Sequence, residues 1–276
     1  MFRKIRFGCF LLYAVLAMTH ESLADDLAKG GFFTDARDGK SYRYVVIGEQ
    51  TWMAENLDFG VKIPLADNQG SASSMSTQKY CPSDSIEFCK SLGALYQWHS
   101  AMAFPRDCDR YPFGCGAKIE SPHRGICPEG WHVPTKEEWM KLQRFAETKT
   151  GTDADSVGGT LKSATGWRQI VEGPPRGVRV PKAKQKCHGC DGGVFEGNGT
   201  DVFGFAALPA GRRYDDNPGM SDIVGSIGLW WSSSRMVGEA ARSSGIWCRG
   251  LQIEDNAFYE VVGNGETGAS LRCVKD

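Results

Sequence analysis

The sequence lacks an excess of charge of either sign, and it lacks long hydrophobic runs beyond its first residues. Its 276 residues carry 32 Lys and Arg against 33 Asp and Glu, a formal net charge of -1. Without a basic excess or a run of Lys and Arg to neutralise phosphates, nucleic acid is not an expected partner. After residue 18, no apolar stretch approaches the ~20 residues that a membrane-spanning helix needs. We therefore expect no membrane span after cleavage of the N-terminal segment.

Several catalytic motifs are also missing. The 5 histidines show neither His-x-x-x-His nor His-Glu-x-x-His spacing, so a zinc hydrolase has no support. No Gly-x-Ser-x-Gly segment supplies the nucleophile of an α/β hydrolase. The neighbouring carboxylates Glu137 and Glu138 would not face each other on a helix, and His132 stands between Trp131 and Pro134, where packing is the expected role. We predict that the chain is not an enzyme.

The first residues have the composition of a secretory signal. Basic residues precede an apolar stretch over residues 7–18 that is too short to span a bilayer comfortably. Ala24 then offers a small residue for cleavage, just before Asp25. We predict a signal peptide over residues 1–24, a short lead over 25–30, and export to the periplasm, the cell surface or the medium of a bacterium. An uncleaved membrane anchor is the alternative.

Cysteine is abundant for an exported chain. Cys9 leaves with the signal, which keeps nine of the 10 cysteines in the mature chain. A set of that size predicts a disulfide framework, and the odd number leaves one thiol without an intrachain partner. Cys81 with Cys89 and Cys108 with Cys115 are candidates for local bridges. Cross-pairing between these two neighbouring loops is the alternative.

Cys187 and Cys190 form a Cys-x-x-Cys segment within a Gly- and Lys-rich stretch. A redox pair would need a helix N-terminus to lower the pKa of the thiol, and a zinc half-site would need two more ligands. We favour a small loop bridge, with these two functions as alternatives. Cys248, beside Trp247, is then the leftover thiol.

Strand patterns occur at both ends of the chain. Residues 32–33 and 42–47 flank the turn signal Asp38-Gly39, which predicts a hairpin, and residues 50–54 would add a third strand. The later strand candidates are residues 202–208, 229–233, 245–253, 257–262 and 269–274. The stretches without such patterns predict loops over residues 60–80, 105–126, 172–199 and 213–224.

Two helices are predicted between these strands. Apolar residues recur near helical spacing over 91–104, and Pro105 would end that helix. Thr135 and Glu138 form a capping box at the start of a second helix over 135–149. Helices followed by an antiparallel meander indicate an α+β fold.

Several distinctive segments follow one another along the chain, among them Ile47-Gly-Glu-Gln-Thr-Trp-Met-Ala-Glu-Asn-Leu57, Gly93-Ala-Leu-Tyr-Gln-Trp98, Gly125-Ile-Cys-Pro-Glu-Gly-Trp131, Phe203-Gly-Phe-Ala-Ala-Leu-Pro-Ala-Gly211, Trp230-Trp-Ser-Ser-Ser234 and Leu271-Arg-Cys-Val-Lys-Asp276. In this order they resemble the Fibrobacter succinogenes major paralogous domain, a family of exported bacterial proteins. The resemblance covers residues 31–276, which we assign to a single domain. Departures from the family's pattern are the Cys108 to Cys115 loop, the 172–196 insertion and Cys248.

The segment from Trp131 to Trp139 is also similar to formylglycine-generating-enzyme-like domains, a branch of the C-type-lectin-like fold. This resemblance implies two main helices against short antiparallel sheets and a long bridge between Cys127 and Cys273. Closing so long a loop would stabilise the fold by about 4–5 kcal/mol in the chain-entropy model. It would also imply a copper oxidase, but Cys248 and Cys273 match no motif of such an enzyme.

Two further segments invite a ligand. In a strand, Trp230 and Trp231 point to opposite faces, so one ring is expected in the core and the other would be a sugar-stacking platform if it were exposed. Residues 196–201, Glu-Gly-Asn-Gly-Thr-Asp, are rich in oxygen atoms. They lack the acidic loop of calcium sites and the Glu-Pro-Asn and Gln-Pro-Asp signatures of calcium lectins. We predict a turn there and no cofactor, with calcium as the alternative.

These observations favour a non-catalytic exported module that binds polysaccharide, or an envelope protein, through its loops. A rigid scaffold that presents variable loops suits recognition. The candidate loops are residues 60–80, 105–124, 172–196 and 213–224. A structural envelope protein is the main alternative, and a cysteine- or metal-dependent enzyme is a weaker one.

Overall fold

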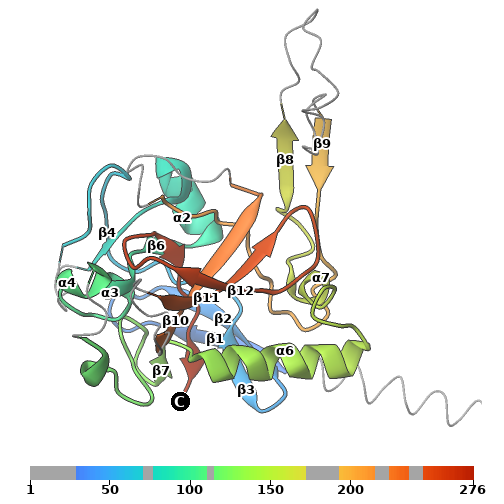
Figure 1. Cartoon of the computed structure of the whole chain (residues 1–276), viewed down its shortest axis with the longest axis horizontal. Helices are drawn as coiled ribbons and strands as arrows, with labels where there is room; N and C mark the ends of the chain where they lie inside the picture. The colour runs from blue at the N-terminus through green and yellow to red at the C-terminus, as the bar shows by residue number, and fades with distance from the viewer. Residues whose placement is uncertain (1–28, 71–76, 111–114, 172–192, 215–223, 236–244) are drawn as a thin grey trace, which may run out of the picture.

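The computed structural model describes residues 29–70, 77–110, 115–171, 193–214, 224–235 and 245–276. The predicted signal peptide and the Cys187–Cys190 segment lie outside these residues. The described chain is a mixed α and β structure with two five-stranded sheets, a single long helix and three disulfides (Figure 1). No described helix is both long enough and apolar enough to cross a membrane.

The first sheet contains the predicted N-terminal hairpin. Its strand order is β1 (Gly30–Thr34), β2 (Ser41–Ile47), β3 (Gln50–Met53), β14 (Val274–Lys275) and β7 (Trp131–His132). β1 and β2 pair antiparallel around the turn at Gly39, whose φ of 74° favours glycine. The hairpin and the third strand are thus confirmed, and the last strand of the chain is inserted between β3 and β7.

The second sheet contains most of the late strands. Its order is β12 (Tyr259–Gly263), β11 (Ile246–Gln252), β10 (Ile227–Arg235), β13 (Ala269–Ser270) and β6 (Leu95–Tyr96). Two small pairs complete the set, β4 (Val61–Lys62) with β5 (Gln78–Lys79), and β8 (Arg168–Val171) with β9 (Gly193–Glu196). β8 and β9 stand out from the body of the molecule (Figure 1).

The helix predicted over 135–149 is present as α6 (Lys136–Thr150). The side chain of Thr135 accepts a hydrogen bond from the Glu138 backbone, and the Glu138 carboxylate accepts one from the Thr135 backbone, which is the predicted capping box. The helix ends at Gly151, whose φ is 67°. Trp139 and Leu142 bury its inner face.

The helix predicted over 91–104 is wrong. The chain forms α2 (Ile86–Leu92), then β6, then the short α3 (Trp98–Ala101). Gly93 has a φ of 80°, which ends α2, and a Cβ there would lie 2.4 Å from the Cβ of Asn56. Only glycine therefore fits where the chain passes this close to Asn56. The remaining short helices are α4 (Asp107–Arg110), α7 (Gly158–Leu161), η1 (Pro82–Asp84) and η2 (Gly116–Lys118). The described chain thus has one main helix, where the lectin-like resemblance implied two.

The strand predicted over 202–208 is also wrong. Asp201 has a φ of 46°, and its carboxylate accepts a hydrogen bond at 2.7 Å from the backbone N–H of Ala206, whose own φ is 50°. This local hydrogen bond closes a turn in place of an extended run. Ala207 makes a single isolated bridge to Lys162.

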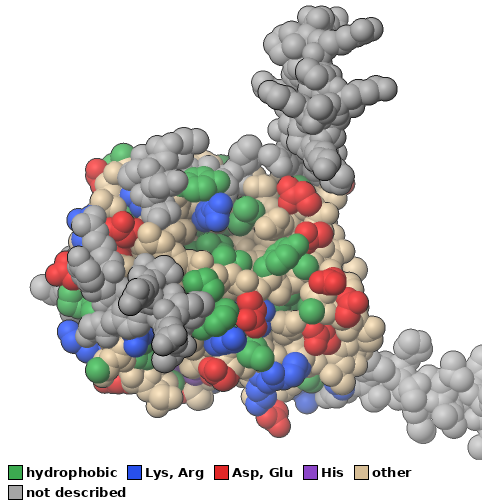
Figure 2. All heavy atoms as spheres, in the orientation of Figure 1, with side chains coloured by type: hydrophobic (Ala, Val, Ile, Leu, Met, Phe, Trp, Pro, Cys, Tyr) green, Lys and Arg blue, Asp and Glu red, His purple; other side chains and the backbone are tan. Residues whose placement is uncertain are grey.

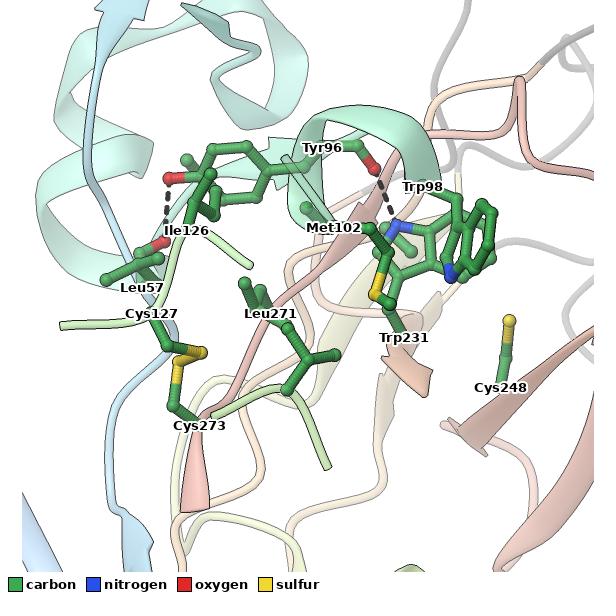
Figure 3. Close-up of a cluster of buried hydrophobic side chains, with 14 of the residues drawn as sticks. Leu57, Tyr96, Trp98, Met102, Ile126, Cys127, Trp231, Cys248, Leu271 and Cys273 are labelled. Carbon is green, nitrogen blue, oxygen red and sulfur yellow. Dashed lines mark hydrogen bonds between the residues drawn. A yellow bond between two sulfur atoms is a disulfide. The ribbon is translucent and has the colours of Figure 1, made fainter. Parts of the chain in front are cut away.

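The two adjacent tryptophans of β10 point into two different hydrophobic cores, and neither is exposed. The Trp231 indole donates a hydrogen bond at 2.7 Å to the backbone carbonyl of Tyr96 in one core (Figure 3). The Trp230 indole donates one at 2.8 Å to the Asn56 side chain at the edge of the other. Both side chains have 0% exposure. Residues of α6 and of the first sheet pack over Trp230 on one face of β10, and Trp231 is buried on the other face. A sugar-stacking platform at these two residues is therefore excluded.

Three disulfides join pairs that the sequence favoured. Cys81–Cys89 and Cys108–Cys115 close local loops, with Cα–Cα distances of 4.9 and 5.7 Å. Cys127–Cys273 spans 146 residues and joins the chain just ahead of β7 to the chain just ahead of β14 (Figure 3). Cys248 is free and buried, and burial raises the pKa of its thiol.

Candidate functional site

A small cleft lies over the β11–β12 hairpin, beside the start of α6 and on the same face of the second sheet as Trp230. It is lined by Lys136, Trp139, Ser232, Trp247, Cys248, Arg249 and Glu260. We call it the Trp247 cleft. In the orientation of Figure 1, basic, acidic and hydrophobic side chains lie close together over β11 and β12 (Figure 2).

Strand register sets the rim of the cleft. Antiparallel pairing places Trp247 opposite Val262 and Arg249 opposite Glu260. Because side chains alternate along a strand, these residues share one face, while Cys248 points to the opposite face and joins the core. Val262 is 46% exposed, which leaves an apolar surface beside the Trp247 ring.

Three charged groups converge on the rim. The Lys136 ammonium, from the first residue of α6, lies 3.7 Å from the centroid of the Trp247 ring. It also lies 3.3 Å from one carboxylate oxygen of Glu260, and the Arg249 guanidinium lies 3.5 Å from the other. Charge-assisted hydrogen bonds are usually 2.7–2.9 Å long. The Glu260 carboxylate is therefore shared by two cations, and both of its ion-pair distances are longer than those of a close charge-assisted hydrogen bond.

The guanidinium of Arg249 is only partly satisfied. Its side chain is 3% exposed; Nη1 donates a hydrogen bond at 3.3 Å to the backbone carbonyl of Phe258. Nη2, the nitrogen that lies 3.5 Å from Glu260, is buried and makes no hydrogen bond to any described residue. Burial lowers the pKa of Arg249, against the charge of Glu260, which raises it. An unpartnered buried donor costs about 1–3 kcal/mol, which is what a bound acceptor would recover.

The residues that line the cleft offer groups that bind polar ligands. Cys248 is the one nucleophilic thiol among them, and burial raises its pKa, which keeps it protonated and unreactive. None of the lining residues is a histidine that would act as its base. The arrangement presents an indole, an ammonium, a guanidinium and a carboxylate, a set suited to holding a polar ligand.

The predicted sites lie elsewhere. None of the described residues of the four candidate loops lines the cleft. In the oxygen-rich segment, the Asn198 side chain accepts a hydrogen bond from the Trp167 backbone, and the Asp201 carboxylate one from the Ala206 backbone. No group of three or more potential metal ligands occurs among the described residues. The cleft itself was missed, although pairing the two late strands about the turn at 254–256 would have aligned Arg249 with Glu260.

His132 was expected to pack, and it is indeed buried, but between two carboxylates. Nδ1 lies 2.7 Å from the side chain of Asp276 and Nε2 lies 2.8 Å from that of Glu138. Burial alone would lower the pKa of His132, but hydrogen bonds to Glu138 and Asp276 outweigh it and raise the pKa above 6.5. Both ring nitrogens are occupied by neighbours within the fold, which indicates a structural clamp.

This clamp gives a pH-dependent stability. The raised pKa of His132 means that the imidazolium stabilises the fold fully below the unfolded value of 6.5 and less as pH rises through the folded value. We expect the free energy of unfolding to fall by about 1 kcal/mol over that rise, since Asp276 is half exposed and its contribution is reduced by solvent. Urea denaturation of wild type and His132→Gln against pH tests this. An equal decline in both proteins would contradict it.

A family model describes most of the chain. The model of the Fibrobacter succinogenes major domain matches residues 45–275, from within β2 to β14. The chain belongs to this family. In this Fibrobacter succinogenes major domain, the match spans the second five-stranded sheet, α6 and every residue of the Trp247 cleft, and it leaves out β1 and the start of β2 in the first sheet. Comparison with curated proteins and with solved structures finds no match.

Proposed function

We propose that the chain is an exported, non-catalytic module that binds polysaccharide at the Trp247 cleft. The observation that carries this proposal is the placement of the Trp247 ring beside three charged side chains near β12, the edge strand of the second sheet. An aromatic face packs against the apolar C–H face of a sugar ring, and the charged groups around it hydrogen-bond hydroxyls. Few convergent polar groups around an apolar surface are typical of ligand sites.

The scaffold supports the same proposal. Short sheets and one capped helix, tied together by a long disulfide, would hold the cleft rigid and so reduce the entropy lost on binding. The rigid elements here are β11, β12 and the first turn of α6. Export through the N-terminal signal would bring the cleft to wall or surface polysaccharide.

Three other functions are alternatives to be tested. A purely structural envelope protein would need no cleft and would bind no polysaccharide. An enzyme that uses cysteine is disfavoured by the burial of Cys248, the one free cysteine of the described chain. Recognition of an envelope protein would use the same face but would not require the Trp247 ring to meet a sugar.

Affinity electrophoresis in gels that contain xylan, mixed-linkage glucan, chitosan or polygalacturonate tests the proposal. We expect at least one polysaccharide to retard the protein, and Trp247→Ala to weaken that binding by at least about tenfold, as loss of a central aromatic anchor does. Phe32→Ala is the matched control, because Phe32 is 73% exposed and lies in β1, outside the cleft. Unretarded migration in every gel, or equal effects of the two variants, would overturn the proposal.

A further inference from the structure

The charges of the Trp247 cleft do not balance. Two cations, Lys136 and Arg249, line it together with one carboxylate, Glu260. Glu147, farther along α6, also places a negative charge near Arg249, but it does not line the cleft. The residues that line the cleft thus carry one more positive charge than negative charge, on a chain whose formal net charge is -1.

The hydrogen bonds of the cleft are incomplete as well. Glu260 lies 3.3 Å from the Lys136 ammonium and 3.5 Å from the Arg249 guanidinium, beyond the 2.7–2.9 Å of close charge-assisted pairs. The buried Nη2 of Arg249 has no hydrogen-bond partner in the described part of the chain. A planar guanidinium is built to bind a carboxylate through two parallel N–H donors. A second carboxylate, supplied by the ligand, would fill both deficits.

We propose that the Trp247 cleft selects acidic saccharides, with a uronic acid carboxylate held by Arg249 and Lys136 and the sugar ring against Trp247. This inference rests on the proposed polysaccharide binding and names its substrate class. Lys136 is the mobile member, because its side chain is 27% exposed and has a long flexible stem. Its ammonium moves from the Trp247 ring to the incoming carboxylate and uncovers the ring face for the sugar.

Neutral saccharides would gain less from the same site. A hydroxyl group accepts from Arg249 without neutralising it, so the uncompensated positive charge of the cleft remains. Binding of the acidic form should therefore weaken as salt is raised, since part of the attraction lies at the partly exposed rim. Binding of a neutral form should be nearly insensitive to salt.

Calorimetric titration of the full mature chain with a galacturonate tetramer, and with its methyl ester, tests the inference. The two probes differ in charge and share the sugar ring. We expect the acid to bind at least about tenfold more tightly than the ester at low salt, and the difference to shrink in 0.5 M NaCl.

Charge variants locate the effect. Lys136→Met should weaken binding of the acid about twofold to fivefold, and Glu260→Gln should strengthen it by a similar factor, because it removes the competing carboxylate. Lys118→Met and Glu129→Gln are matched controls, since both residues are exposed and lie outside the cleft. Lys136→Met and Glu260→Gln both keep the buried Arg249, whose replacement could prevent the protein from folding.

The outcomes separate the two proposals. Equal affinity for acid and ester, or retardation by neutral polysaccharides alone, would overturn acidic selection and leave polysaccharide binding standing. Absence of binding to the tetramers and to every polysaccharide gel would overturn both. If Lys136→Met and Glu260→Gln changed the affinity for the acid no more than the two control variants do, any acidic binding would lie outside the Trp247 cleft. That result would also overturn the inference.

Discussion

Replacing Cys127 and Cys273 together with alanine should lower the free energy of unfolding by about 5 kcal/mol, as the chain-entropy model gives for so long a loop. The bridge spans 146 residues and fixes the approach to β7 and to β14, which pair with each other in the first sheet. Without the bridge, the unfolded chain can adopt conformations that the closed loop excludes, so its entropy rises and the folded state becomes less stable. Guanidinium denaturation, monitored by far-UV circular dichroism, measures the change.

The Cys81–Cys89 pair is the matched control for this experiment. All four cysteines are fully buried, so the same substitutions remove the same buried sulfur atoms. The control loop spans 8 residues, for which the same model gives about 2.5 kcal/mol. Equal losses in the two double variants would mean that loop closure is not the source of stability.

Replacing Asp109 with alanine should cost about 3–5 kcal/mol, the usual result of breaking a buried pair. His99 and Asp109 are 0% and 1% exposed, and His99 Nδ1 lies 2.6 Å from the carboxylate of Asp109. His99 Nε2 lies 2.9 Å from the backbone carbonyl of Gly70, so it must carry a hydrogen. Loss of the carboxylate leaves both Nδ1 and the His99 backbone N–H without their partner.

Replacing Asp109 with asparagine should be far milder, within about 1.5 kcal/mol. The amide oxygen would accept from the His99 backbone, and the amide nitrogen would donate to Nδ1 of a neutral imidazole, so every hydrogen bond is kept. Burial raises the pKa of Asp109, which agrees with a site that tolerates a neutral group. Thermal and chemical denaturation of the two variants compares them. A cost for asparagine as large as that for alanine would show that the pair requires full charge.

Features set by local sequence were predictable. The capping box of Thr135 and Glu138 depends on four consecutive residues, and the first hairpin depends on the Asp38-Gly39 turn. The two local disulfides were predictable in the same way, because the cysteines of each pair lie close together in the sequence. In each case the interactions that decide the structure lie within a few residues of one another, so tertiary context has little to add.

Features set by packing were not predictable. The apolar residues at 91–104 were interpreted as one helical face, but Leu92 and Leu95 lie in different elements of one core cluster and Met102 lies in another cluster. Periodicity cannot separate these cases when a segment is buried on all sides. Trp230 and Trp231 are hidden for a related reason, since β10 is an inner strand that separates two cores.

The Trp247 cleft was half predictable. Strand candidates at 245–253 and 257–262 were named, and their antiparallel register would have placed Trp247 and Arg249 on one face with Glu260. The third charge comes from Lys136, more than a hundred residues earlier in the sequence. Its position depends on how α6 packs across the second sheet, which no local pattern specifies.

The indole N–H signals of the 8 tryptophans provide the most direct test of binding at this cleft. Two of the rings line the cleft, Trp139 and Trp247, and Trp247 is the more exposed of the two, since the other seven tryptophans are at most 4% exposed. A ¹⁵N-edited titration with oligosaccharide from the polysaccharide that retards the protein most strongly, with Trp247 assigned through Trp247→Phe, should shift the Trp247 indole signal most, shift that of Trp139 less, and leave the six outside the cleft nearly unchanged. A titration that mainly shifts an indole outside the cleft, or shifts none while binding is saturated, would contradict recognition at the Trp247 cleft.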